Sequence, residues 1–111
     1  MGNTDYQTFG DMLSQKRISM GLTLRELAAQ LNISPPYLTD IEKNRRRPFE
    51  YDRLQRLVKI LGLTKSEADS LYDLAGQGRK EVPPDLVDFV MDNSHVRRFL
   101  RAMRDNGITG Q

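Results

Sequence analysis

The stretch TLRELAAQLNISPPYLTDIEKNRRRP, residues 23–48, contains two closely spaced helix starts followed by three consecutive arginines. Thr23 and Glu26 form a capping box, in which the side chain of each residue binds the backbone N–H of the other. Apolar side chains then recur at helical spacing as far as Leu31. The pattern predicts a helix that begins at this threonine and ends near that leucine.

A second helix follows after a three-residue turn. Ser34 is suited to cap its N-terminus, and Pro35 fits the first helical position, where no backbone donor is needed. Asn44 tolerates the left-handed backbone that ends a helix. We therefore predict a helix over about 35–43, and a pair of helices over about 23–44.

The rest of the chain is also predicted to be helical. A second capping box, Thr64 with Glu67, and a leucine stripe before it indicate two more helices, the last ending at Gly76. Another helix precedes the pair, and no segment alternates as a strand would. The sequence predicts an all-α chain, with five helices over residues 5–76.

Composition changes after this five-helix domain. Residues 77–83 are predicted to form a linker that is rich in charged residues and ends at the first of two prolines. Two short helices are predicted over 84–106, with Ser94 as the cap of the second and Gly107 as its stop. We expect these two helices to be a C-terminal extension of the domain.

Several classes of function are disfavoured by the residues present. The chain of 111 residues has no cysteine, which excludes disulfides and thiol catalysis, and His95 is its only histidine. No apolar run is long enough to cross a membrane, and the first residues do not resemble a secretory signal. We expect a cytoplasmic protein that is not an enzyme and has no catalytic residue, metal site or cofactor.

Charge is unevenly distributed, although the net charge is only +2. Residues 15–48 carry seven basic and three acidic side chains, and residues 94–104 carry four arginines and no acid. Residues 81–92 carry four acids and no base. Such blocks favour binding to other molecules or to other parts of the chain.

Two helices joined by a short turn form the unit that places its second helix in the DNA major groove. A helix about 10–12 Å across fits a groove roughly 12 Å wide. The three arginines after the second helix would lie where phosphates run. Residues 23–48 therefore also point to DNA.

The segment FGDMLSQKRISMGLTLRELAAQLNISPPYLTDIEKNRRRP, residues 9–48, resembles the lambda-repressor and Cro type of helix-turn-helix regulators (the XRE-type family). With the two helices that follow, the resemblance covers about residues 5–76. Asn44 departs from the glycine that the family often has there. The matching residues are Phe9, Gly10, Leu13, Arg17, Gly21, Leu22, Thr23, Leu27, Ala28, Ile33, Ser34, Tyr37, Leu38, Ile41, Glu42 and Pro48.

The resemblance implies roles for particular residues. One group, on the outer side of the recognition helix, would read bases; a second would hold phosphates; and a pair would orient that helix. These groups are Pro36, Tyr37, Thr39, Asp40 and Lys43 for bases; Thr23, Arg25, Arg45, Arg46 and Arg47 for phosphates; and Arg17 with Glu42 for the pair.

Each assignment has a plainer alternative. Thr23 could serve only as a cap, and Tyr37 could simply pack at the start of its helix. The three arginines could form a solvated loop, and Arg17 and Glu42 could be exposed and unpaired. Asp40 would repel phosphates unless it accepts a hydrogen bond from cytosine.

The expected function is sequence-specific binding of double-stranded DNA by a repressor, as a homodimer on a palindromic operator. The alternative is an antitoxin or adaptor with a protein partner, bound through residues 84–106, and secondary DNA binding. Phe89, Phe99 and Leu100 are the expected dimer contact, because two such short helices need burial. The competing arrangement has them fold back on the core of their own chain.

Overall fold

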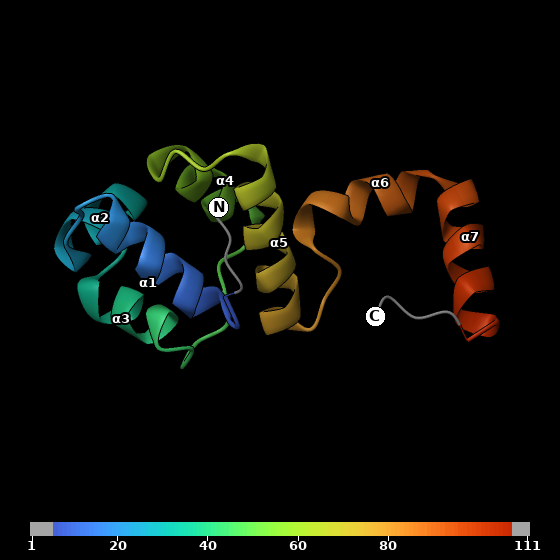
Figure 1. Cartoon of the computed structure of the whole chain (residues 1–111), viewed down its shortest axis with the longest axis horizontal. Helices are drawn as coiled ribbons and strands as arrows, with labels where there is room; N and C mark the ends of the chain where they lie inside the picture. Colours follow the sequence, from blue (N-terminus) through green and yellow to red (C-terminus); the bar gives the residue numbers. More distant parts are fainter. Residues whose placement is uncertain (1–5, 108–111) are drawn as a thin grey trace.

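The computed structural model describes residues 6–107, and every regular element in that range is helical (Figure 1). The prediction of an all-α fold is therefore confirmed. The elements are α1 (Phe9–Ser19), α2 (Leu24–Leu31), α3 (Pro35–Glu42), α4 (Tyr51–Ile60), α5 (Lys65–Arg79), the 3₁₀ turn η1 (Pro84–Leu86), α6 (Val87–Asp92) and α7 (Ser94–Asp105). None of the helices within this range is both long and apolar enough to cross a bilayer.

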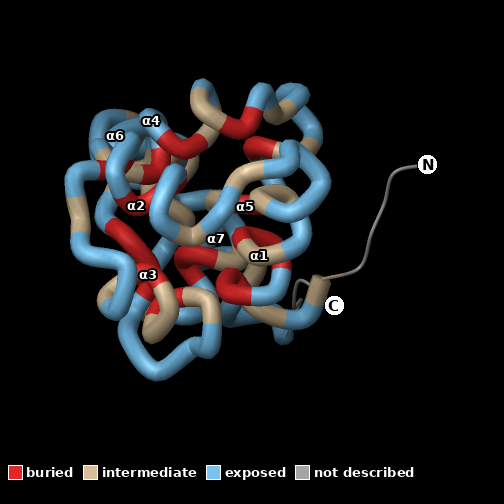
Figure 2. The backbone as a smooth tube through the Cα atoms, turned by 90° about the vertical axis from the view of Figure 1, so that its left-hand side faces the viewer, coloured by how far each residue is buried: buried red, intermediate tan, exposed pale blue. Residues whose placement is uncertain are grey.

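Helices α1 to α5 enclose one apolar core. Helix α1 packs on α3 and α5, and α2 packs on α3 and α4. Leucines supply most of the core, at the helical spacings that the sequence shows, and Figure 2 places the buried segments inside this domain. The buried apolar side chains are Phe9, Met12, Leu13, Leu27, Ala28, Leu31, Leu38, Ile41, Phe49, Leu54, Leu57, Leu61, Ala68, Leu71 and Ala75.

Both predicted capping boxes form. Thr23 Oγ1 accepts a hydrogen bond from the N–H of Glu26 at 3.0 Å, and the glutamate accepts one from Thr23 N–H at 2.8 Å. Thr64 and Glu67 repeat the arrangement at the start of α5. Lys16 of α1 donates to the Glu67 carboxylate at 2.6 Å, and this bond is the main reason why the pKa of Glu67 is lowered. The second capping box therefore also joins α5 to α1.

The predicted end of the fifth helix was wrong. Helix α5 continues to Arg79 and ends at Lys80, which has a left-handed backbone with φ of 58°. Gly76 lies inside the helix, where a Cβ would stand 2.8 Å from the carbonyl oxygen of Glu81. This glycine lets the returning chain cross close to the helix, and the linker predicted at 77–83 therefore begins inside α5.

The start of α7 also differs from the prediction. Asn93, with an extended backbone, occupies the cap position, and Ser94 is the first residue of the helix. No side chain caps the N-terminus of α7. The predicted stop at Gly107 agrees with its φ of 75°.

Residues 84–105, which we call the arm, project from the domain (Figure 1). The arm is joined to the domain where η1 packs on α5, and α6 then packs on η1 and α7. No residue of η1, α6 or α7 is buried. The arm therefore does not fold back over the core, and the structure is elongated, with extents of 47 × 28 × 25 Å.

Candidate nucleic-acid interface

The turn between α2 and α3 is built from local backbone preferences. Asn32 adopts a left-handed backbone with φ of 63°, which ends α2. Ser34 Oγ then accepts from the N–H of Tyr37 at 3.2 Å, and Pro35 occupies the first turn of α3. Leu38 and Ile41 turn into the core. The opposite side of α3, which carries Pro36, Thr39 and Asp40, faces away from the core.

The five candidate base-reading residues are not equally accessible. Pro36 and Lys43 are exposed, while Tyr37, Thr39 and Asp40 are partly buried. The Tyr37 ring packs edge-on against Phe49, with 6.2 Å between ring centroids. Part of the Tyr37 ring therefore packs at the start of its helix, as the alternative prediction for this residue stated.

Asp40 lies next to the arginines that follow α3. Arg45 Nη1 stands 3.3 Å from one Asp40 carboxylate oxygen, and Arg46 Nε stands 3.9 Å from the other. The Arg46 guanidinium also lies over the Tyr37 ring, 5.3 Å from its centroid. The aspartate thus balances part of the positive charge beside the outer face of α3.

The loop after α3 presents three accessible guanidinium groups. The side chains of Arg45, Arg46 and Arg47 are 64%, 60% and 61% exposed. Arg47 turns away from α3, because it donates to the carboxylate of Glu81 at 3.1 Å and to the carbonyl oxygen of Arg79 at 3.2 Å. Two of the arginines therefore lie beside α3, and the third lies at the end of α5.

A hollow of about 600 Å³ lies beside this loop. Arg53 and Arg56 of α4 add two arginines that the sequence analysis did not single out. Arg53 lies over the Phe49 ring at 5.7 Å, and Arg56 donates to the carbonyl oxygen of Gln30 at 2.7 Å. The other residues that line the hollow are Tyr37, Arg46, Arg47, Pro48, Glu50, Asp52 and Arg79. This side of the molecule thus combines positive charge with aromatic surface.

The helix-turn-helix family model matches residues 13–67, a range that contains α2, α3 and the arginine loop. Residues 13–67 form a helix-turn-helix domain of this family. It is also similar to the HTH-type transcriptional regulator DdrOP3 of Deinococcus deserti, with 31% identity over 83 residues. The matched part is 74% of this chain and 64% of that regulator, so the chain spans less than two thirds of its length. Comparison with solved structures gives no significant match.

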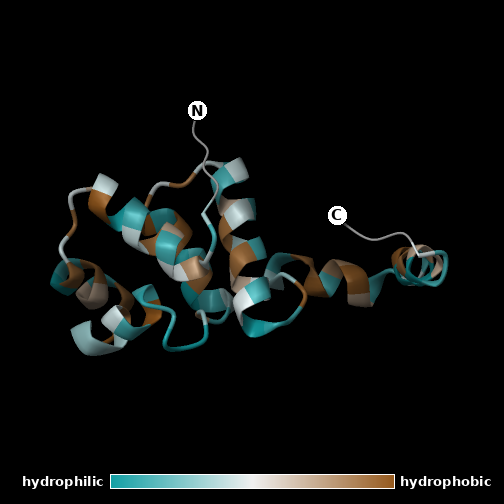
Figure 3. Ribbon diagram, turned by 60° about the horizontal axis from the view of Figure 1, so that its bottom comes forward, coloured by the Kyte–Doolittle hydropathy of each residue, from teal (hydrophilic) through white to brown (hydrophobic). Residues whose placement is uncertain are grey.

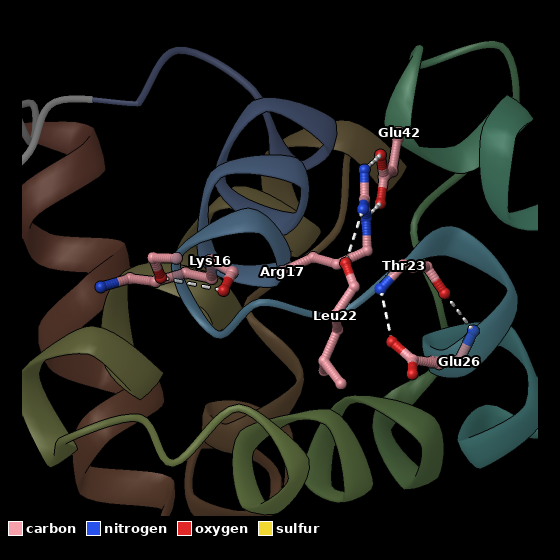
Figure 4. Close-up of polar contacts among 7 residues, drawn as sticks. Lys16, Arg17, Leu22, Thr23, Glu26 and Glu42 are labelled. Carbon is pink, nitrogen blue, oxygen red and sulfur yellow. Dashed lines mark hydrogen bonds and ion pairs between the residues drawn. The ribbon is translucent and has the colours of Figure 1, made fainter.

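The helix-turn-helix pair begins at Thr23, whose side chain and backbone are both used in the capping box (Figure 4). Thr23 and Arg25 are exposed at the N-terminus of α2. Backbone N–H groups at a helix N-terminus favour an anion. Both residues are therefore accessible to a phosphate, in addition to the capping role of the threonine.

Arg17 connects three parts of the helix-turn-helix domain (Figure 4). Its Nε and Nη2 donate to the two carboxylate oxygens of Glu42, at 2.7 and 3.1 Å. Its Nη1 donates to the carbonyl oxygen of Leu22, at 2.9 Å. The two charged side chains are only 13% and 8% exposed. The last turn of α3 is thus held to α1 and to the turn before α2.

Asn44 joins the end of α3 to the start of α1, a contact that the spacing of residues did not predict. Its backbone is left-handed, with φ of 59°. Its side-chain oxygen accepts from the N–H of Gly10 at 3.0 Å, and its nitrogen donates to Thr8 Oγ1 at 2.9 Å. A Cβ on Gly10 would lie 2.3 Å from the carbonyl oxygen of Glu42. The glycine therefore permits the close approach of α1 and α3.

The helix-turn-helix domain and the arm do not assemble a metal site within the described residues. No group of three or more histidine, aspartate or glutamate side chains among residues 6–107 is arranged to hold a metal ion. His95 is exposed on the first turn of α7.

Proposed function

We propose that the chain is a transcriptional regulator, a repressor that binds double-stranded DNA with sequence specificity. The observation that carries this proposal is the placement of Arg45 and Arg46 beside the outer face of α3. With α3 in the major groove, guanidinium groups next to it reach the flanking phosphates. The family of the chain and the regulator to which it is similar support the same function.

Base reading is proposed for the outer side of α3 and its end, through Pro36, Tyr37, Thr39, Asp40 and Lys43. Phosphate binding is proposed for Thr23, Arg25 and the three loop arginines, listed above. Two copies on a palindromic operator would place two recognition helices about one DNA turn apart. Double-stranded DNA and a second copy of the chain are therefore the proposed partners.

Neutralising the arginine loop should reduce the salt dependence of DNA binding. Each phosphate contact that is lost lowers the log–log slope of affinity against salt by roughly 0.9, because fewer counterions are released. The triple variant Arg45→Ala, Arg46→Ala and Arg47→Ala should bind all DNA sequences more weakly. Fluorescence anisotropy with random and selected duplexes over a salt series measures both effects.

The control removes two basic side chains, Lys59 at the end of α4 and Lys65 at the start of α5. The connection between these two helices lies at the top of Figure 1, away from the arginine loop. That double alanine variant should keep the salt slope of the wild type. An unchanged slope in the triple arginine variant, with the domain still folded, would show that the loop does not hold phosphates.

Asp40→Asn separates base reading from charge balance. If Asp40 accepts from cytosine, the variant loses about 1–3 kcal/mol of preference at one position of each half-site. Binding to random DNA should become tighter at the same time, because Arg45 and Arg46 lose the carboxylate that they face. Site selection from a random pool gives the first readout, and anisotropy with random DNA gives the second.

Asp69→Asn is the control for this variant. Asp69 forms an exposed pair with Lys65 at 3.3 Å on α5, so the charge change is the same but far from α3. If site selection gives the same DNA motif for Asp40→Asn and for the wild type, Asp40 does not read a base.

The second candidate function is an antitoxin or adaptor with a protein partner, and the uncovered apolar side chains of the arm favour it. A simple measurement of DNA binding distinguishes the two candidate functions. Retention of the purified protein on random DNA that decreases with salt supports the regulator. A chain that binds no DNA at low salt would support the protein-binding alternative.

A further inference from the structure

The arm leaves apolar side chains in contact with solvent. Nine large hydrophobic side chains among the described residues are exposed, and six of them belong to the arm. Phe89 is 56% exposed, Phe99 is 64% exposed and Leu100 is 45% exposed. Figure 3 shows the hydrophobic bands on this projecting part of the chain. A concentration of this kind marks a surface that binds a partner.

The arm has a defined shape although it has no core of its own. Arg97 donates to the carbonyl oxygen of Val90 at 2.9 Å and also to that of Met91. Asn93 Nδ2 donates to the carbonyl oxygen of Phe89 at 2.8 Å. These bonds satisfy carbonyl groups at the end of α6 and hold the corner between α6 and α7. The arm is therefore already ordered at this corner, and less conformational entropy is lost when a partner binds it.

Opposite charges occupy the two helices of the arm. Asp85, Asp88 and Asp92 are spaced to share one side of η1 and α6, and Arg101 and Arg104 lie on α7. Between residues 6 and 107, no ion pair within 4.0 Å joins an aspartate of α6 to an arginine of α7. Arg104 pairs with the neighbouring Asp105 of α7 at 3.0 Å, in an exposed contact. Arg101 and the three aspartates form no ion pair among residues 6–107 and are available to a molecule with the opposite charge pattern.

The root of the arm adds further negative charge. Asp73 of α5 lies near Asp85, and burial, followed by repulsion from Asp85 and Asp69, raises the pKa of the Asp73 carboxyl. The acidic surface therefore extends from α5 along η1 to α6. A basic helix with an apolar side would match it, and α7 of this same chain has that composition.

We propose that a second copy of the chain covers the arm, with α7 of each copy lying along η1 and α6 of the other. In a two-fold contact every pair occurs twice, so the aspartates of each α6 face the arginines of the other α7. Packing α6 on α6 or α7 on α7 would bring like charges together, which disfavours those arrangements. The proposal rests on the proposed function in one respect, since two half-sites require two copies.

Phe89, Phe99 and Leu100 lie at the centre of this contact. Aromatic side chains in the middle of an interface account for much of its binding energy, whereas charged pairs at its edge mainly select the partner and the orientation. The aromatic side chains therefore set the affinity of the contact. The aspartates and arginines set the pairing of α7 with α6 of the other copy.

The first test measures the mass of the full chain without DNA by sedimentation equilibrium. The wild type should be a dimer at micromolar concentration, and Phe99→Ala should raise the dissociation constant at least about 30-fold. Ile18→Ala is the matched control, because Ile18 is 60% exposed but lies on α1. The control should dimerise like the wild type. A monomeric wild type, or a Phe99→Ala dimer of unchanged affinity, would overturn the proposal.

The second test exchanges charges and does not depend on removing apolar surface. One variant carries Asp88→Arg and Asp92→Arg, and the other carries Arg101→Asp and Arg104→Asp. Each variant alone should be mainly monomeric, because like charges then face each other across the contact. An equimolar mixture should form heterodimers, since opposite charges face each other again. Failure of the mixture to associate would overturn the proposed arrangement.

The two proposals can fail separately. Dimerisation is measured without DNA, and DNA binding is measured with a duplex that carries a single half-site. If the protein is a monomer that still binds the half-site, the proposed arm contact is wrong and the proposed regulatory function stands. If the protein is a dimer that the arm variants disrupt, but it binds no DNA, the proposed arm contact stands and the proposed regulatory function is wrong.

Discussion

Arg17→Ala is expected to lower the free energy of unfolding by about 3–5 kcal/mol, because it leaves the Glu42 carboxylate uncompensated and largely buried. The Glu42 side chain is 8% exposed, and both of its oxygens receive hydrogen bonds from Arg17. The variant also loses the bond to the carbonyl oxygen of Leu22. Urea denaturation followed by circular dichroism measures the change directly.

Arg45→Ala is the matched control, since it removes an arginine from an exposed ion pair in the same domain. It should cost less than about 1 kcal/mol, as exposed pairs usually do. A loss for Arg17→Ala that is no larger than the loss for this control would contradict the proposed brace.

The double variant Arg17→Met with Glu42→Leu separates stability from orientation. Replacing a buried pair by apolar side chains is often neutral or stabilising. Much of the stability lost in Arg17→Ala should therefore return. Specific DNA binding should remain weaker than in the wild type, because no bidentate contact then positions the last turn of α3.

Gly10→Ala is expected to destabilise the domain by about 2 kcal/mol, although alanine is the better helix former. The gain in helix propensity is at most about 1 kcal/mol. Against it, the new Cβ would lie 2.3 Å from the backbone carbonyl oxygen of Glu42, which cannot move without shifting α3. The free-energy cost of this overpacking is larger than the gain in helix propensity. The melting temperature should fall by roughly 4–8 °C for each kcal/mol.

Two further variants test whether the clash at position 10 causes the expected loss of stability. Gln15→Ala, at an exposed position of α1, should change stability by less than about 0.5 kcal/mol. Asn44→Gly keeps the left-handed backbone but removes the hydrogen bonds to Gly10 and Thr8, and should cost about 1 kcal/mol. A Gly10→Ala protein as stable as the wild type would mean that α1 and α3 separate easily.

Local signals in the sequence predicted much of the fold. The capping boxes at Thr23 and Thr64, and the helix end near Asn44, depend on residues within one or two helical turns. Apolar spacing was similarly sufficient to identify the core faces of α2 and α4. These features are encoded by neighbouring residues, and a reading of the chain recovers them.

The errors and omissions concern contacts that depend on how the chain turns back on itself in three dimensions. Gly76 resembled a helix stop, but it is a point where the chain after α5 crosses the helix closely. Arg53 of α4 and Arg47 of the loop line the same hollow, which no local spacing reveals. Asp40 faces Arg45 and Arg46, and the sequence did not predict these two ion pairs. Tertiary packing determines each of these, so sequence patterns alone were insufficient.

The contact between α1 and α3 limits how the family can diverge at two positions. Asn44 can be exchanged for glycine at a cost of about 1 kcal/mol, because glycine keeps the left-handed backbone and loses only the side-chain hydrogen bonds. Position 10 faces a backbone carbonyl oxygen, which every residue at position 42 would place there. No second substitution in the recognition helix removes that atom. Relatives should therefore have glycine at position 10 even where the residue at position 44 is not asparagine.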